Sequence, residues 1–342
     1  MENRILQEDI DSFRLPDELT ERLRNSTILV TGATGLIGSV FVKCLAGLDA
    51  GIRFVLPVRN AEKAAEIFEA ELASGSVTIV ESKLTEFFST ASDRCDYILH
   101  CASPTDGKYM CAHPTETFML AVDSTRALLD YSRRHGTKGI VYLSSIEQYG
   151  QMNSDAPIAE EMEGYVDRQS PRSSYALGKQ AAEYLCYCYA TEYGMPVKTA
   201  RLTQTFGAGI RKDDKRVFAQ FARSVIEGRD IVLHTEGVSA KPYCYTTDCV
   251  SALIHILLKG QAGEAYNVAT PGSYITIRGL AELCRNCFNP AMGVRVQPLE
   301  NAGYAPDTRV NLDSGKLLAM GWTPRYGLRE MMGRLIDYLQ EE

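Results

Sequence analysis

Short apolar, β-branched runs alternate with longer helical stretches along the first 200 residues of the chain. The first run, residues 27–31, leads into a glycine-rich turn, and apolar residues at helical spacing follow. Continuous apolar runs of this length are typical of strands that are buried in a parallel sheet. Further strands are predicted at 52–58, 77–80, 97–102, 140–145 and 197–201. Helices are predicted at 61–73, 115–135 and 174–193.

This alternation predicts an α/β fold, a Rossmann doubly wound parallel sheet. Beyond about residue 203 the pattern loosens and turn residues become more frequent. We therefore expect residues 27–202 to form the sheet domain. Residues 203–342 should form mainly a small C-terminal lobe, interleaved with the last sheet elements, over the carboxyl ends of the strands. Residues 1–26 are interpreted as a helical extension, broken at Pro16, that serves as a surface or oligomer-stabilising arm.

Three glycines, Gly32, Gly35 and Gly38, occupy the turn between the first strand and its helix. The first glycine permits a tight turn, the second lets a pyrophosphate approach the backbone, and the third lets the helix pack closely on the strand. The helix N-terminus offers free N–H groups and the positive end of its dipole to phosphates. The alternative is a turn that holds glycines by chance, but the strand–turn–helix context favours an NAD(P) site. Cofactor contacts are also expected from Thr34, Leu36 and Ile37.

A tyrosine and a lysine lie one turn apart on a predicted helix, at Tyr175 and Lys179. A nearby ammonium group favours the phenolate and is expected to lower the pKa of the tyrosine. Ser145 ends a predicted strand, where its hydroxyl can hydrogen-bond a substrate oxygen. The three residues suit hydride transfer between a sugar-type carbinol and a nicotinamide. Alone, the tyrosine and lysine could be an ordinary surface pair of a helix.

The composition of the chain argues against nucleic-acid binding, membrane association and metal binding. The net charge of −7 argues against a nucleic-acid-binding protein, which usually has a basic face. No apolar run reaches transmembrane length and no signal-like block opens the chain, so we expect a cytoplasmic protein without a membrane partner. The ten cysteines are interpreted as reduced core thiols. Cys284 and Cys287 have metal-like spacing, but no second pair or histidine cluster accompanies them, so no metal is expected.

Together these stretches resemble the extended short-chain dehydrogenase/reductase family of nucleotide-sugar epimerases and dehydratases. The resemblance covers roughly residues 26–340. It rests on residues 31–38, 100–104, 144–150, 175–179, 201–207, 243–248, 266–268 and 320–324. Within the family, the chain is most similar to the UDP-glucuronate decarboxylases. That closer similarity rests on residues 102–104, 109–110, 113–114, 206–207 and 214–217.

The resemblance implies a nucleotide-diphosphate sugar as substrate and a homodimer, in which the helices at 115–135 and 174–193 pair across a two-fold axis. It also implies the contact residues. For the cofactor these are Arg59, Asn60, Lys83, Leu84, Cys101, Ala102, Ser103, Tyr175 and Lys179. For the substrate they are Ser103, Pro104, Gln204, Arg216, Val217, Lys241 and Arg309.

Several positions depart from the family pattern. Arg59 stands where members that use NAD carry an acidic residue, and an arginine can pair with a 2′-phosphate, with Lys63 one turn further on. The sequence therefore favours NADP slightly over NAD. Gln204 replaces a usual asparagine. Lys241 replaces an arginine, which keeps the charge but loses the bidentate fork.

The pair Ile146 and Glu147 bears on the reaction. The 4,6-dehydratases of the family carry two acids here, and Ile146 cannot donate a proton. Glu147 remains, as in the decarboxylases, and is expected to be catalytic; the alternative is a solvated loop residue. We expect a decarboxylase or a 4-epimerase that oxidises C4 and later returns the hydride. The alternatives are an NADPH-dependent 4-keto sugar-nucleotide reductase, favoured by Arg59, and a non-catalytic dinucleotide-binding protein.

Overall fold

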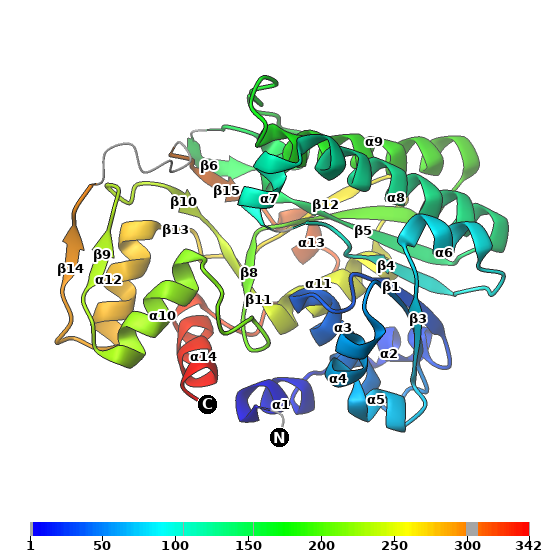
Figure 1. Ribbon diagram of the computed structural model, residues 1–342, viewed down its shortest axis with the longest axis horizontal. Helices are drawn as coiled ribbons and strands as arrows, with labels where there is room; N and C mark the ends of the chain where they lie inside the picture. The colour runs from blue at the N-terminus through cyan, green and yellow to red at the C-terminus, as the bar shows by residue number, and fades with distance from the viewer. Residues whose placement is uncertain (1–2, 105, 153, 299–306, 342) are drawn as a thin grey trace.

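The computed structural model describes residues 3–104, 106–152, 154–298 and 307–341. Its centre is a seven-stranded sheet in the order β12-β7-β5-β4-β1-β2-β3 (Figure 1). Every pair of neighbours in this sheet is parallel. The α/β Rossmann prediction is confirmed. The strands are β1 (Thr27–Thr31), β2 (Arg53–Val58), β3 (Val77–Glu81), β4 (Tyr97–His100), β5 (Gly139–Ser145), β7 (Val197–Leu202) and β12 (Ala265–Val268).

The direction of the strand order reverses at β1. The chain moves outward through β2 and β3 and then returns, so that β4 pairs with the other side of β1. Thr31 lies opposite His100 in that pair. The loops that follow β1 and β4 are therefore neighbours at the carboxyl edge of the sheet. This reversal is the place where open α/β sheets bind their ligands.

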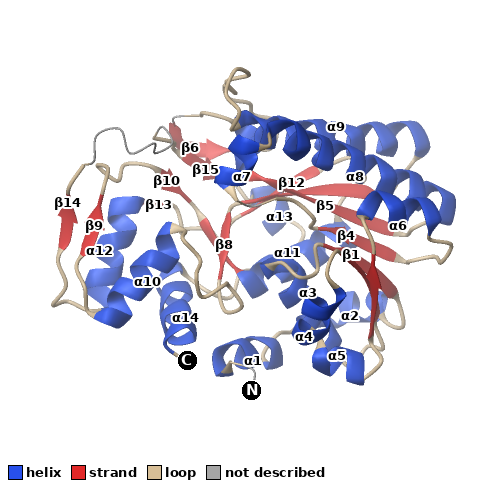
Figure 2. Ribbon diagram, viewed as in Figure 1, coloured by secondary structure: helices blue, strands red, loops and turns tan. Residues whose placement is uncertain are grey.

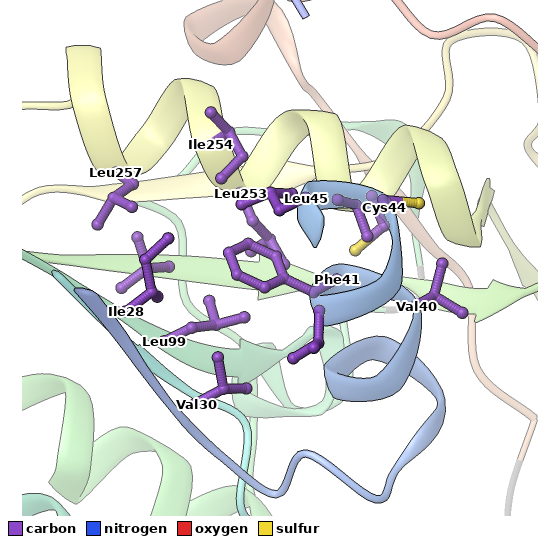
Figure 3. Packing of buried hydrophobic residues seen from close by; sticks show 14 of the residues in the cluster. Ile28, Val30, Val40, Phe41, Cys44, Leu45, Leu99, Leu253, Ile254 and Leu257 are labelled. Carbon is purple, nitrogen blue, oxygen red and sulfur yellow. The ribbon is translucent and has the colours of Figure 1, made fainter. Parts of the chain in front are cut away.

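Helices cover both faces of the sheet (Figure 2). One face carries α3 (Leu36–Ala46) and α11 (Thr246–Lys259), and the other carries α6 (Leu84–Thr90), α8 (Pro114–His135) and α9 (Ser173–Tyr193). Figure 3 shows Phe41 of α3 lying between Leu99 of the sheet and Leu253 of α11. None of the three side chains is more than 1% exposed. Burying a side chain of this size stabilises the fold by roughly 1.5–3 kcal/mol.

Two predicted elements differ from the structure. The helix at 61–73 is divided into α4 (Ala61–Ile67) and α5 (Glu69–Ala73), because Phe68 leaves helical geometry, at φ −113° and ψ 31°, to bury its ring completely. The strand at 97–102 ends at His100. Beyond it the Cys101 N–H still donates to the Thr31 carbonyl at 3.2 Å, but the Ala102 N–H donates to the hydroxyl of Thr31 at 3.2 Å.

The N-terminal segment is helical, as expected, with α1 (Arg4–Asp11) and α2 (Asp17–Leu23) on either side of Pro16. Its interpretation as a surface arm is wrong, because Leu19 and Leu23 are fully buried in the main core. Asp9 is also buried and accepts hydrogen bonds from the hydroxyl of Tyr245 at 2.6 Å and from Nε of Arg334 at 2.9 Å. Helix α1 thus connects the glycine-loop side of the sheet to the last helix of the chain.

The second lobe has a core of its own, to which Phe206, Phe218 and Met331 belong. Its short strands pair in twos rather than joining the large sheet (Figure 1). Helix α11 and strand β12, although late in the chain, belong to the large sheet and its cover. The proposed boundaries at residues 26 and 202 stay a prediction. The elements of this lobe are β8 (Gln204–Phe206), α10 (Val217–Glu227), β9 (Ile231–Leu233), β10 (Ala240–Lys241), β11 (Tyr243–Tyr245), β13 (Ile275–Thr276), α12 (Ile277–Phe288), β14 (Val294–Val296) and α14 (Leu328–Gln340).

Three shorter elements lie between the two parts: β6 (Ser154–Ile158) pairs with β15 (Val310–Leu312), and α13 (Gly315–Leu318) packs against β12. All ten cysteines are free thiols; six are buried, whereas Cys111 is exposed and Cys101, Cys188 and Cys287 are partly exposed, so the interpretation as core thiols holds for six of them. Within the described ranges, no group of three or more His, Cys, Asp or Glu side chains could hold a metal ion. No helix of the described chain is both long and apolar enough to cross a bilayer.

Candidate functional site

The glycine turn between β1 and α3 has no room for side chains at two of its three glycines. Gly32 has φ +66°, and a Cβ there would lie 2.8 Å from the backbone nitrogen of Ala102. A Cβ on Gly38 would lie 2.5 Å from the carbonyl oxygen of Gly32. Gly35 is exposed at the N-terminus of α3, where no side chain caps the helix. Thr34, Leu36 and Ile37 are partly exposed beside it. This cradle fits a pyrophosphate group.

The loop after β4 is held against this turn by buried polar side chains. The hydroxyl of Thr31 and Nδ1 of His100 are 2.7 Å apart, and Nε2 of His100 lies 3.3 Å from the hydroxyl of Ser124. Burial lowers the pKa of His100 to about 3, so the ring is neutral and serves as a hydrogen-bonding spacer. The chain then runs partly exposed along the site through Cys101, Ala102, Ser103 and Pro104.

Arg59 and Asn60 follow β2, the neighbour of β1, and both are exposed. The Asn60 side chain caps α4 by accepting a hydrogen bond from the Lys63 backbone N–H at 2.8 Å. Arg59 thus lies at the edge of the sheet where the adenosine end of a dinucleotide would lie. Lys83 and Leu84 follow β3, one strand further out, with Lys83 exposed just before α6.

Ser145, Tyr175 and Lys179 come together at the carboxyl end of β5. Ser145 ends the strand, and its hydroxyl accepts a hydrogen bond from the Glu147 N–H at 3.2 Å. Lys179 is buried and donates from Nζ to the Leu143 carbonyl at 2.7 Å. Its Nζ lies 5.7 Å from the centre of the Tyr175 ring. Burial lowers the pKa of Lys179 to about 8.

The expected lowering of the Tyr175 pKa is wrong for this structure. Burial of the phenol, with the nearby charge of Glu147 adding to it, raises the pKa of Tyr175 to about 12. The hydroxyls of Ser145 and Ser103 act in the opposite direction but do not outweigh burial. The ammonium of Lys179 is already engaged by a backbone carbonyl. The phenol is therefore the stable form of Tyr175 here.

Glu147 belongs to a charged cluster rather than to a solvated loop. It lies in the short 3-10 turn η1 (Ile146–Tyr149) that follows β5. Nη2 of Arg172 donates to Oε1 of Glu147 at 2.9 Å and lies 2.7 Å from Oε2 in the ion pair. Lys241 on β10 also lies within the electrostatic reach of Glu147 and Arg172. Burial lowers its pKa, the charge of Glu147 partly offsets this, and Arg172 adds a smaller lowering. The cluster borders Tyr175, whose ring centre is 5.6 Å from Cζ of Arg172.

Sequence reasoning missed Arg172. The available signal was its position three residues before Tyr175, at the N-terminal cap of α9. Spacing alone does not show that η1 turns back toward this helix and brings Glu147 to it.

The remaining predicted substrate residues lie further from the cluster or are paired elsewhere. Gln204 is partly exposed on β8, opposite Tyr243 of β11. Arg216 donates from Nη2 to Asp214 at 2.6 Å, immediately before Val217 begins α10. Nη1 of Arg309 donates to the exposed Asp155 at 2.9 Å, so this guanidinium is engaged at the surface, although its backbone bridges to Ala240 next to Lys241.

The sequence model of the NAD dependent epimerase/dehydratase family matches residues 28–269, which span the sheet, the glycine turn and the cluster around Tyr175. The chain belongs to this family. The predictions of the family and of an enzyme are confirmed.

Among curated relatives, UDP-glucuronic acid decarboxylase 3 of Arabidopsis thaliana is 28% identical over 309 residues, which cover 90% of this chain and 86% of the relative. The dTDP-glucose 4,6-dehydratase of Streptomyces antibioticus is 24% identical over 324 residues, or 92% of each chain.

Solved structures of the family share the fold. The UDP-glucose 4-epimerase of Thermotoga maritima with UDP-glucose has a TM-score of 0.77 at 21% identity, covering 92% of this chain and 98% of its own. RMD of Pseudomonas aeruginosa, complexed with NADPH, has a TM-score of 0.73 at 23% identity, covering 93% and 100%. The family is NAD-dependent. Its structural neighbours include complexes with NAD and with NADPH.

Proposed function

We propose that this enzyme acts on a nucleotide-diphosphate sugar by oxidising C4 through hydride transfer, and that its substrate is UDP-glucuronate, which it decarboxylates. The observation that carries this proposal is the position of Glu147, held by Arg172 beside Tyr175 and Ser145. The two curated relatives described above are consistent with it, since one is named a decarboxylase and the other a dehydratase. A 4-epimerase acting through the same C4 oxidation is the nearest alternative.

Each proton transfer in this reaction would be carried out by a residue of the site. The minor phenolate form of Tyr175, which has already lost its proton to solvent, takes the proton of the C4 hydroxyl, and the hydroxyl of Ser145 hydrogen-bonds the same oxygen. The glycine turn would hold the pyrophosphate of a nicotinamide cofactor, which when bound would supply the hydride acceptor and donor. A ketone at C4 makes the sugar acid a β-keto acid, so the bond between C5 and its carboxylate breaks and leaves the electron pair on C5. Glu147 then helps to deliver a proton to C5, while Lys241 offsets the negative charge of the substrate.

Incubation with cofactor and UDP-glucuronate tests the proposal directly. We expect a product lighter by the mass of carbon dioxide, detected by mass spectrometry, because the cluster provides both the oxidising and the proton-delivering groups. A protein that leaves every uronic-acid nucleotide unchanged but converts a neutral or 4-keto sugar nucleotide would refute the decarboxylase assignment.

The second candidate function is an NADPH-dependent 4-keto sugar-nucleotide reductase. Arg59 favours it, because an exchangeable NADPH is the usual cofactor of a reductase and a guanidinium can pair with the 2′-phosphate. The mass of the cofactor that copurifies with the protein separates the two candidates: a retained NAD supports the decarboxylase.

We expect Arg59→Asp to weaken NADP binding, because a carboxylate at this edge of the sheet repels the 2′-phosphate and accepts hydrogen bonds from the ribose hydroxyls of NAD. Fluorescence titration of both cofactors on the wild type and the variant measures the change. Arg53→Asp, an exposed arginine at the opposite end of β2, is the matched control. If the wild type binds NAD at least as tightly as NADP, the preference for NADP is wrong.

We also propose a homodimer formed by α8 and α9. Each helix leaves large apolar side chains exposed: Met119 and Leu120 on α8, and Tyr184 and Tyr187 on α9, with Tyr184 67% exposed. Two copies related by a two-fold axis would cover these side chains in a four-helix interface. Tyr184→Glu should shift sedimentation toward the monomer, whereas Tyr165→Glu, on a loop and 65% exposed, should not. A wild type that is monomeric at micromolar concentration contradicts the proposal.

A further inference from the structure

The guanidinium of Arg172 is only partly used by the protein. Its Nη2 binds both oxygens of Glu147. Its Nη1 is buried, yet no hydrogen-bond acceptor lies within reach of it in the part of the chain that the structure describes. Buried polar groups nearly always have partners, and a guanidinium with an unused N–H pair in a catalytic site is prepared for an acceptor from outside.

The charges around Arg172 indicate what kind of acceptor this is. Arg172 and Lys241 are two cations that share one carboxylate, Glu147. Glu147 favours the charged form of Lys241 more strongly than Arg172 disfavours it. Two cations against one carboxylate leave one formal positive charge in excess. A further anion therefore suits the site better than a neutral hydroxyl does.

The position of Arg172 relates this anion to the sugar. The guanidinium lies 5.6 Å from the ring of Tyr175, on the helix that also carries Lys179. Tyr175 takes its proton from C4 in the proposed reaction, so groups around its ring face the neighbouring carbons of the same sugar. The carboxylate of a hexuronic acid, on C5, is the anion within that range, whereas the diphosphate is further along the substrate.

We propose that Arg172 determines specificity for a hexuronic acid: Nη2 holds Glu147, and Nη1 binds an oxygen of the substrate carboxylate. This inference rests on the proposed function. An arginine suits the role because its planar fork offers several donors in fixed directions, so that one side chain bridges two carboxylates. Lysine, with a single nitrogen, cannot reach both with the same geometry.

The test compares the equilibrium binding of UDP-glucuronate and UDP-glucose, which share the nucleotide and the diphosphate and differ only at C6. Arg172→Gln should weaken UDP-glucuronate by about 10- to 100-fold, the usual effect of losing a hydrogen bond between charged groups. UDP-glucose should change by less than about threefold, since it has no carboxylate to lose. Arg168→Gln, an exposed arginine four residues earlier, is the control and should change neither.

The affinities of the wild type test the proposed function, and those of the variants test the role of Arg172. If the wild type does not prefer UDP-glucuronate over UDP-glucose, the proposed function fails. If it does, but Arg172→Gln weakens both ligands equally, the inference about Arg172 is overturned and the proposed function stands. Should the glutamine variant not fold, Arg172→Lys decides: a selective loss of UDP-glucuronate affinity supports the inference, and unchanged affinity overturns it.

Discussion

Tyr175→Phe should lower the rate of hydride transfer by about 10²–10⁴-fold, the usual contribution of a positioned proton-transfer group. The change removes only the hydroxyl, so the ring keeps its place between Arg172 and Lys179. The glycine turn that would hold the cofactor belongs to β1 and α3 and is untouched. Cofactor affinity should therefore be unchanged. Stopped-flow absorbance of the reduced nicotinamide measures the first quantity, and cofactor fluorescence measures the second.

The matched control is Tyr184→Phe, which removes the same atom from an exposed tyrosine of the same helix. It should transfer hydride at the wild-type rate. If Tyr175→Phe also turns over within a few-fold of the wild type, Tyr175 is not the catalytic acid/base and the raised pKa of its hydroxyl has no role in the reaction.

Glu147→Gln should separate the oxidation at C4, the first half of the proposed reaction, from the decarboxylation and protonation at C5, the second half. An amide can still accept a hydrogen bond from Arg172, but it cannot carry a proton to C5. Release of carbon dioxide over many turnovers should fall by at least about 100-fold, because the C5 carbanion left by the first turnover is not protonated and the cycle cannot be completed. Reduced cofactor should still form, because Ser145, Tyr175 and Lys179 are intact. Trapping of labelled carbon dioxide from C6, with absorbance recorded in parallel, measures both halves.

Glu161→Gln, on an exposed loop after β6, is the control for the loss of a carboxylate. It should leave both halves unchanged. If Glu147→Gln releases carbon dioxide at the wild-type rate, Glu147 serves only to hold Arg172. If it loses hydride transfer as well, the carboxylate is needed for the first step, and the division of work proposed above is wrong.

The sheet could be predicted from the sequence because parallel strands buried on both faces are continuous apolar runs, and the runs that form β1 and β5 are of this kind. The burial of α2 could not be predicted in this way. Leu19 and Leu23 have the spacing of any amphipathic helix, and the core that covers them comes from residues far along the chain. Strand β12 was missed for a similar reason, since four residues after a helix become a strand only by pairing with β7.

Most residues of the site could be predicted from the sequence, but their pKa values and ion pairs could not. Spacing placed Tyr175 and Lys179 on one helix face, and the structure brings Ser145 and Glu147 to them. Spacing says nothing of burial, which reverses the expected direction of the Tyr175 pKa. It also says nothing of ion pairs between distant residues. The guanidinium of Arg309 is engaged by Asp155, and that contact depends on the pairing of β6 with β15.

The first and last helices of the described chain, α1 and α14, pack against each other (Figure 1). Asn3 donates from its side chain to the Tyr338 carbonyl, Nε of Arg4 donates to Glu341 at 2.7 Å, and Nε of Arg334 donates to Asp9 at 2.9 Å. Helix α1 therefore has its partners more than 300 residues away in the sequence. During folding α1 stays undocked until α14 has formed, and contacts between segments so distant in sequence form slowly. Loss of either segment would leave the buried carboxylate of Asp9 or the guanidinium of Arg334 without its partner, so each end of the chain depends on the other.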